Sequence, residues 1–350
     1  MKKTAYISAA LSLSLLFAAC NSGQEIPQPA GQQVEIVFSM DNYTKVVTST
    51  KSVSTSQTRA SEAVGSEKEN IITDLNLFLF DTNGQNPKSY YFDTSTTTSG
   101  TWTHSTADRK GNIKLNLTQA EAGKRRVYIV ANYGSGLSPS TIDDLKGVSR
   151  STDTPWSTTL ATPILMSGDK EHNFITNRVL GGDTDEPVHL TRVLAKLELN
   201  IKLKKEHQSK PVIQEGVPNE LVPKHQYHYA FLNFEKETHL LSLNNKTTNN
   251  LAHEVLDPII LKEVDSSLWK QWTADVNGIT SYTTNGDGEV IHMTLTTYLN
   301  ERAFPDPRSF IGLWIPYNGA VPPPEFGPDL TGIYLPQLKR NHWYVYDVEI

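Results

Sequence analysis

Cysteine is almost missing from this sequence, because Cys20 is the only one among 350 residues. No disulfide can therefore form within one molecule, and no other thiol is present to act as a catalytic nucleophile. The fold must be stabilised by the packing of apolar side chains. Apolar residues make up 37% of the chain and aromatic residues 9%, which is enough to build substantial cores.

Clusters of basic residues are missing as well. The formal net charge is -6 and the pI is about 5.9. No lysine and arginine cluster supplies the phosphate contacts that a nucleic acid requires, so the composition argues against nucleic-acid binding. At roughly 100–200 residues per domain, the length predicts two domains.

Motifs that signal catalysis or metal binding are also absent. The 10 histidines are scattered: His189, His292 and His342 lie on predicted strands, and His225 and His228 have no carboxylate at ligand spacing. The sequence has no HExxH, GxSxG, GxGxxG or Walker A motif. We therefore expect no enzyme, no catalytic residue, no cofactor and no metal. A pair of catalytic carboxylates without a local motif is the alternative that this pattern leaves open.

One acidic stretch, NGDGE at 285–289, superficially resembles a calcium loop. It lacks the regular series of acidic ligands and the distal bidentate glutamate of such loops. We interpret it as the turn of a β-hairpin.

The only long apolar run lies at the N-terminus, in MKKTAYISAALSLSLLFAAC. Two lysines precede an apolar run from Ala9 to Phe17, and small residues precede Cys20, so residues 1–19 are predicted to be a secretory signal peptide. LFAAC resembles a bacterial lipobox, which implies cleavage before Cys20 and lipid on its sulfur. Residues 20–32 are then a polar, lipidated tether.

Period-two alternation is the dominant pattern in the rest of the chain. It is clearest at 34–40, at 72–81 and in AKLELNIKLKK at 195–205, while helical periodicity is nearly absent. The sequence therefore predicts an all-β protein of two β-sandwich domains with few short helices. A turn-rich acidic seam at 177–187 divides them, giving an N-terminal domain at 33–185 and a C-terminal domain at 186–350.

The last residues, RNHWYVYDVEI, form one more predicted strand. His342, Tyr344 and Tyr346 share one face of an extended chain, whereas Asp347 and Glu349 share the other. We expect this strand to be clamped inside its own sheet.

A threonine- and serine-rich segment, Thr48–Ser61, is nearly devoid of apolar residues and is predicted to be a surface loop. It contains Arg59, a candidate site for an arginine-specific protease, because proteases cut exposed polar loops. Cleavage there would detach the strand at 34–40 and open an apolar groove to another protein's strand. A plain flexible loop is the alternative.

Several motifs together resemble the fimbrillin superfamily of Bacteroidetes lipoproteins. They are the lipobox at Cys20, ITDLNLFLFD (72–81), YIVANYG (128–134), PILMSG (163–168), VHLTRVLAKLELNI (188–201) and the terminal RNHWYVYDVEI. The resemblance implies two tandem transthyretin-like sandwiches, an outer-membrane lipoprotein at the cell surface, and assembly with other fimbrial subunits by strand exchange. Arg59 is similar in position to the family's processing arginine.

Within this superfamily the sequence is most similar to the outer-membrane anchor of minor fimbriae, because nothing resembling a C-terminal donor segment follows the last strand. A tip adhesin is the alternative. An anchor would be expected to keep its first strand, so this interpretation does not depend on cleavage at Arg59. The resemblance also leaves room for a host or bacterial surface ligand.

A second hypothesis is a surface glycan-binding lipoprotein. Exposed tryptophans such as Trp269, Trp272 or Trp314 would then stack on sugar rings. Packing in a core or at a domain interface is the alternative role of these side chains.

The mass and N-terminal sequence of the mature protein from cells test these hypotheses. A lipidated Cys20 at the N-terminus is expected for an anchor. A terminus at Ala60 would instead show that the strand at 34–40 is discarded and that a partner's strand takes its place.

Overall fold

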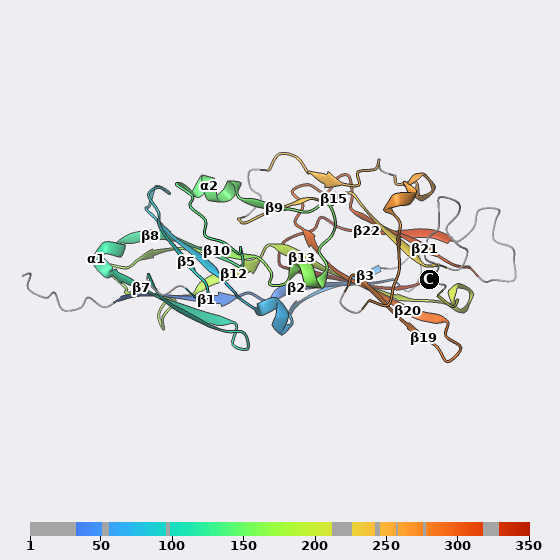
Figure 1. Cartoon of the computed structure of the whole chain (residues 1–350), viewed down its shortest axis with the longest axis horizontal. Coiled ribbons are helices and arrows are strands. Elements are labelled where there is room, and N and C mark those ends of the chain that lie inside the picture. Colours follow the sequence, from blue (N-terminus) through green and yellow to red (C-terminus); the bar gives the residue numbers. More distant parts are fainter. Residues whose placement is uncertain are drawn as a thin grey trace, which may run out of the picture.

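The computed structural model describes residues 33–50, 56–95, 99–211, 226–241, 246–256, 258–275, 278–317 and 329–350. The predicted signal peptide and Cys20 lie outside these residues. The described chain is mainly β with a few short helices, which confirms the predicted all-β class. Two lobes follow one another along the long axis (Figure 1).

The first lobe is built on a nine-stranded sheet with the order β5-β4-β8-β10-β12-β1-β7-β6, in which β11 also pairs with β1. Its strands are β1 (Gln33–Met40), β4 (Leu75–Phe80), β5 (Lys88–Phe92), β6 (Gly100–Ser105), β7 (Lys110–Thr118), β8 (Lys124–Ala131), β10 (Met166–Asn173), β11 (Val179–Leu180) and β12 (Val188–Arg192). Figure 1 shows β5, β8 and β10 above β1 and β7. A single apolar core joins side chains of both groups, such as Phe38 of β1 and Ile129 of β8.

The second lobe pairs a six-stranded sheet, β19-β20-β13-β23-β2-β3, with a four-stranded sheet, β18-β14-β21-β22. The larger sheet contains β2 (Tyr43–Thr50), β3 (Ser56–Ala63), β13 (Leu194–Lys202), β19 (Thr280–Thr284), β20 (Val290–Asn300) and β23 (His342–Glu349), and the smaller one β14 (His228–Leu232), β18 (Lys270–Gln271), β21 (Phe310–Ile315) and β22 (Asp329–Tyr334). Leu199 of β13 and Leu313 of β21 belong to the same core, so the two sheets face each other.

Short elements connect and cover these sheets. Two small sheets pair β15 (Phe234–Glu235) with β17 (Leu251–Ala252) and β16 (Glu237–His239) with β9 (Ser149–Ser151). The helices are η1 (Glu67–Asn70), α1 (Gln119–Ala122), α2 (Ile142–Gly147), α3 (Thr158–Ala161), η2 (Lys205–His207), η3 (Leu261–Glu263) and η4 (Ser266–Leu268). The interpretation of 285–289 as a hairpin turn is confirmed, because it joins β19 to β20.

The terminal strand is clamped inside its sheet, as predicted. β23 pairs in parallel with β13 on one side and with β2 on the other. Tyr344 is 4% exposed and faces the core, while Asp347 and Glu349 are exposed on the opposite face.

The prediction of a loop at Thr48–Ser61 is wrong. Its described residues form the end of β2 and most of β3, two antiparallel strands in which Val47 lies opposite Arg59. β3 is an edge strand, where polar residues protect the sheet against aggregation, so it has no apolar alternation for a sequence pattern to detect. β-branched threonine and valine suit the extended conformation. Both strands therefore pair in the sheet of the second lobe, although the predicted limits assigned them to the first domain.

The buried face of β1 provides a test of the fold. Phe38 is fully buried, and Phe38→Ala is expected to lower the free energy of unfolding by about 3–5 kcal/mol because it removes a ring and leaves a cavity. Ser39→Ala on the opposite face of the same strand removes only an exposed hydrogen bond to His189 and should change it by less than about 1 kcal/mol. Urea denaturation measures both. Equal stability of the two variants would contradict the assigned register.

Candidate functional site

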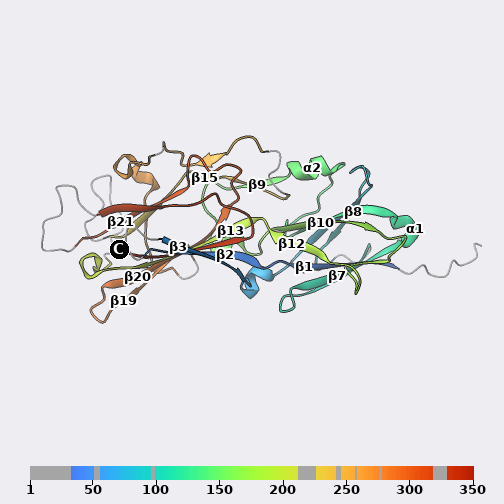
Figure 2. The same cartoon turned by 180° about the vertical axis from the view of Figure 1, so that it is seen from behind.

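The N-terminal strands connect the two lobes. β1 runs between β7 and β12 in the first sheet, and β2 runs between β23 and β3 in the second. Only Asp41 and Asn42 separate these strands. One extended segment, 33–50, thus fills a position in each sheet, and Figure 2 shows β1 and β2 following one another along the molecule.

β1 contributes a continuous apolar face to the first core. Val34, Ile36 and Phe38 are 0% exposed and Met40 is 4% exposed. Fully burying a side chain of this kind contributes about 1.5–3 kcal/mol. On the other side of the strand, Glu35 lies 3.8 Å from the guanidinium of Arg178. Removal of β1 would therefore leave an apolar groove between β7 and β12.

Arg192, the last residue of β12, places a charged side chain where the two lobes meet. It is 0% exposed. Its Nη1 donates to the Asp41 carbonyl at 2.7 Å and to Asn341 Oδ1 at 3.1 Å. Its Nε donates to the Glu69 carbonyl at 3.3 Å, and Nη2 donates to Asn70 Oδ1. These partners come from separate parts of the chain, so one guanidinium joins them all.

The carboxylate of Glu69 lies beside this arginine and is equally buried. It accepts hydrogen bonds from the hydroxyls of Tyr43 at 3.1 Å and Tyr298 at 2.7 Å. Lys196 Nζ lies 3.2 Å from Glu69 Oε1. A capping box with Ser66 fixes the side chain at the start of η1.

These contacts keep Glu69 ionised. Burial acts to raise the pKa of Glu69, but the charge of Lys196 and the hydrogen bond from Tyr298 lower it by more, so the pKa lies below the ordinary value of 4.5. Burial raises the pKa of Tyr43 well above its ordinary value, so its hydroxyl stays protonated and donates. The site therefore pairs a carboxylate with neutral phenol donors.

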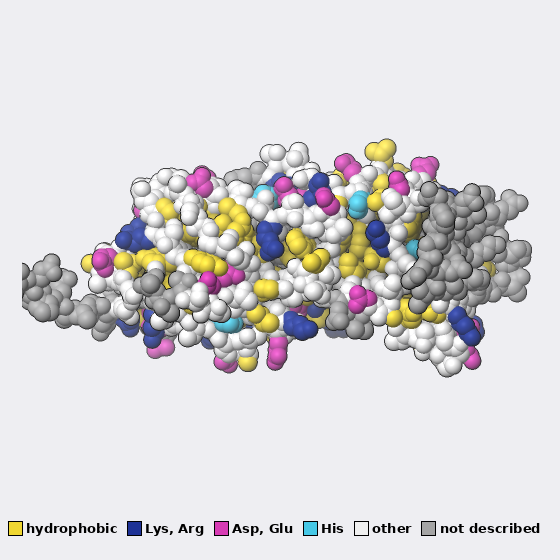
Figure 3. All heavy atoms as spheres, viewed as in Figure 1, with side chains coloured by type: hydrophobic (Ala, Val, Ile, Leu, Met, Phe, Trp, Pro, Cys, Tyr) yellow, Lys and Arg dark blue, Asp and Glu magenta, His cyan; other side chains and the backbone are white. Residues whose placement is uncertain are grey.

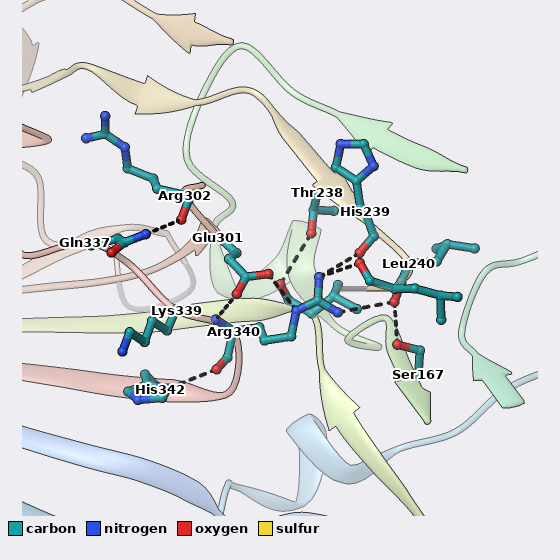
Figure 4. A network of polar contacts seen from close by, with 12 residues as sticks. Ser167, Thr238, His239, Leu240, Glu301, Arg302, Gln337, Lys339, Arg340 and His342 are labelled. Atoms are coloured by element: carbon teal, nitrogen blue, oxygen red, sulfur yellow. Dashed lines mark hydrogen bonds and ion pairs between the residues drawn. The ribbon is translucent and has the colours of Figure 1, made fainter. Parts of the chain in front are cut away.

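A second polar network, shown in Figure 4, supports the same region. Arg340, two residues before β23, donates through Nε to Glu301 at 2.7 Å. Its Nη atoms reach the carbonyls of His239, Leu240 and Leu241 at 3.2, 3.3 and 2.9 Å. Ser167 of β10 also donates to the Leu240 carbonyl, which links the first sheet to this network.

The predicted processing residue Arg59 is exposed on the edge strand β3. Cleavage after it would separate β1, β2 and the first residues of β3 from the rest of the chain. Because β2 pairs with β3 over its whole length, the hairpin must open for the N-terminal piece to leave. Cys20, the predicted lipidation site, lies outside the described residues.

The predicted tryptophan platform is not formed by Trp272, which is 3% exposed and donates through Nε1 to the Ser281 carbonyl at 2.8 Å. Trp269 and Trp314 are half-buried and contact each other edge to face, with ring centroids 5.7 Å apart. Core and surface packing therefore accounts for these side chains.

The described residues contain no group of three or more His, Cys, Asp or Glu side chains that could hold a metal. His189 instead lies 3.0 Å from Asp41 Oδ1, and His225 lies outside the described residues. On the face that Figure 3 shows, acidic and basic side chains are scattered and do not gather into one patch. In the part of the chain that the structure describes, no helix is long and apolar enough to cross a membrane.

Sequence reasoning missed Glu69, Arg192 and Arg340. For Arg192 and Glu69, the sequence contains a pattern that could have indicated their role. Arg192 occupies a core-facing position in the alternation Val188, Leu190, Arg192, where an arginine needs buried partners. Ser66 and Glu69 match the capping-box pattern.

Comparison with known proteins gives three kinds of similarity. Residues 193–349 match the family model of the minor fimbrium tip subunit MfA4, C-terminal, and residues 44–204 match that of the major fimbrial subunit protein FimA. The chain is 36% identical to the minor fimbrium tip subunit MfA4 of Porphyromonas gingivalis over 365 aligned residues, covering 100% of both chains.

Solved structures are similar at lower identity. The tip fimbrial protein Mfa3 of Porphyromonas gingivalis, with a C-terminal truncation, is 12% identical with a TM-score of 0.45, and the match covers 90% of this chain and 95% of that one. A fimbrilin (FimA) of Porphyromonas gingivalis W83 is 12% identical with a TM-score of 0.42, covering 83% and 81%.

The Glu69 site predicts a pH-dependent stability. Its pKa is lower in the folded protein than the ordinary 4.5, so its contribution is present above about pH 4.5 and is lost as the pH falls through the folded value. Glu69→Gln is expected to cost about 3–5 kcal/mol at pH 7, because it leaves the largely buried ammonium of Lys196 without its charged partner. The difference in the free energy of unfolding between wild type and Glu69→Gln should become smaller as the pH falls.

Glu67→Gln, on the exposed side of the same short helix, is the matched control. Urea denaturation at pH 7 and at pH values below 4.5 measures both variants. A deficit for Glu69→Gln that stays constant over this range would contradict an ionised carboxylate.

Proposed function

This chain belongs to the fimbrillin superfamily as a minor fimbrial accessory subunit, and from this premise we propose that it is the tip subunit of a minor fimbria, joined to its neighbour by strand exchange. Similarity to a tip subunit over the full length of both chains carries the assignment to the tip. The sequence resemblance had favoured the anchor, but the relative matched over the whole chain carries the name of a tip subunit.

The path of the N-terminal segment supports strand exchange. Cleavage after Arg59 would release residues that occupy a position in each sheet. Backbone groups of β7 and β12 would then lack partners in the first sheet, and those of β23 in the second. Such edges template the addition of a strand, and the apolar pockets that Val34, Ile36 and Phe38 now fill would select its side chains.

The same cleavage gives Cys20 a transient role in this proposal. Lipid on Cys20 would hold the exported precursor in the outer membrane. Cleavage after Arg59 would separate the lipidated piece from the rest, so the mature tip subunit would be retained only by its neighbour in the fimbria. The exposed tip is where a ligand on a host or bacterial surface would bind. The proposal includes no catalytic role.

Replacing the processing residue tests this proposal. In wild-type cells the mature protein is expected to begin at Ala60 and to co-purify with fimbriae at low copy number. Arg59→Lys should preserve the charge but block an arginine-specific protease, so the lipidated precursor should accumulate and the subunit should disappear from fimbriae. N-terminal sequencing and immunoblotting of purified fimbriae measure both effects.

Thr58→Ala is the matched control, because it changes the neighbouring residue and leaves the arginine. It should be processed like wild type. A wild-type mature terminus at Cys20, or normal fimbriae in a deletion strain, would contradict the tip proposal.

A further inference from the structure

The segment that crosses between the two sheets, Asp41–Tyr43, is held by side chains as well as by the backbone. We propose that a set of residues, here called the junction site, recognises an acid at position 41 and a tyrosine at position 43 of this crossing, and that after processing it selects a neighbouring subunit's strand with the same two side chains. The junction site consists of Glu69, His189, Thr191, Arg192 and Asn341. This inference rests on the proposed strand exchange.

Two of the contacts fix the backbone of the crossing segment. Arg192 Nη1 donates to the Asp41 carbonyl at 2.7 Å, and Asn341 Nδ2 donates to the Asn42 carbonyl at 2.6 Å. The amide of Thr44 returns a hydrogen bond to the Asn341 carbonyl at 3.0 Å. Because Arg192 is fully buried, losing one of its acceptors is costly. These contacts set the register of any strand that crosses here.

Further contacts recognise the side chain at position 41. Asp41 Oδ1 lies 3.0 Å from His189 Nδ1, and Asp41 Oδ2 accepts from Thr191 Oγ1 at 2.9 Å. Both carboxylate oxygens therefore have a partner on β12. An apolar residue at this position would remove both contacts, and Thr191 Oγ1 would lose the carboxylate to which it donates.

The tyrosine position is the most specific part of the junction site. Tyr43 is 1% exposed, its ring lies 4.3 Å from Arg192 Cζ, and its hydroxyl donates to Glu69 Oε1 at 3.1 Å. Gly65 makes room for the ring, since a Cβ there would lie 3.0 Å from Tyr43 Cε2. The space fits an aromatic ring, and the carboxylate at its end favours tyrosine over phenylalanine.

The order of these residues in the chain connects the site to assembly. Every member of the junction site follows Arg59, so all stay with the processed subunit, whereas Asp41–Tyr43 leaves with the released piece. After the cut, Arg192 would lose its contacts with the Asp41 carbonyl and the Tyr43 ring. Glu69 would lose the hydrogen bond from the Tyr43 hydroxyl. A buried charge that loses its partners is strongly destabilising. The incoming strand that restores all three is therefore favoured over one that only fills the apolar grooves.

Synthetic peptides test the site. The full-length protein is cut after Arg59 with an arginine-specific protease, the released piece is removed in urea, and the protein is refolded with a labelled peptide of residues 33–50. We expect this peptide to bind, Tyr43→Phe and Asp41→Ala peptides to bind about tenfold more weakly, and a Tyr43→Ala peptide to bind more than about a hundredfold more weakly. A Ser49→Ala peptide, changed on β2 away from the junction, is the control and should bind like the native sequence.

A substitution in the protein tests whether Glu69 is the residue that recognises the hydroxyl of Tyr43. In Glu69→Gln protein the difference in affinity between the native peptide and the Tyr43→Phe peptide should fall by at least about threefold, because the charged acceptor is gone. If that variant does not fold, the peptide series on the wild-type protein decides. Equal binding of all peptides, or no binding of the native one, overturns the junction site. Failure of the proposed processing would appear separately, as a mature terminus in cells that precedes Ala60.

Discussion

The buried guanidinium of Arg192 is the interaction on which the rest of the structure depends. A fully buried cation is tolerated only where acceptors surround it, and this one draws its acceptors from the link after β1, from η1 and from the residue before β23. The lobes therefore meet through a shared set of polar partners. The carboxylate of Glu69 lies beside this arginine, pairs with Lys196 at 3.2 Å and accepts hydrogen bonds from the hydroxyls of Tyr43 and Tyr298.

The path of the N-terminal segment depends on the same guanidinium. β1 and β2 belong to different sheets, but the crossing between them is one of the acceptors of Arg192. The two lobes thus share one continuous segment of chain, 33–50, and an event that removes it acts on both sheets at once. Under the proposed processing, loss of this segment would open both sheets together to a neighbouring subunit.

Much of this architecture could be predicted from the sequence, and the failures have physical causes. The alternation in β1, β13 and β23 predicted their buried faces because one side of each strand packs on a core. β2 and β3 were missed because an edge hairpin is stabilised by cross-strand hydrogen bonds that leave no period in apolar residues. Arg192 and Glu69 come from distant parts of the chain, so their proximity is a property of the fold and not of any local motif.

The parallel pairing of β2 with β23 has a consequence for how the protein folds. Thr44 lies opposite His342 and Thr50 opposite Val348, contacts between residues about 300 positions apart. Such long-range contacts slow folding, because the loop entropy must be lost before the pairing stabilises the chain. β2 can pair with β23 only once the last residues of the chain are available, and until then its backbone edge is open to strands of other molecules.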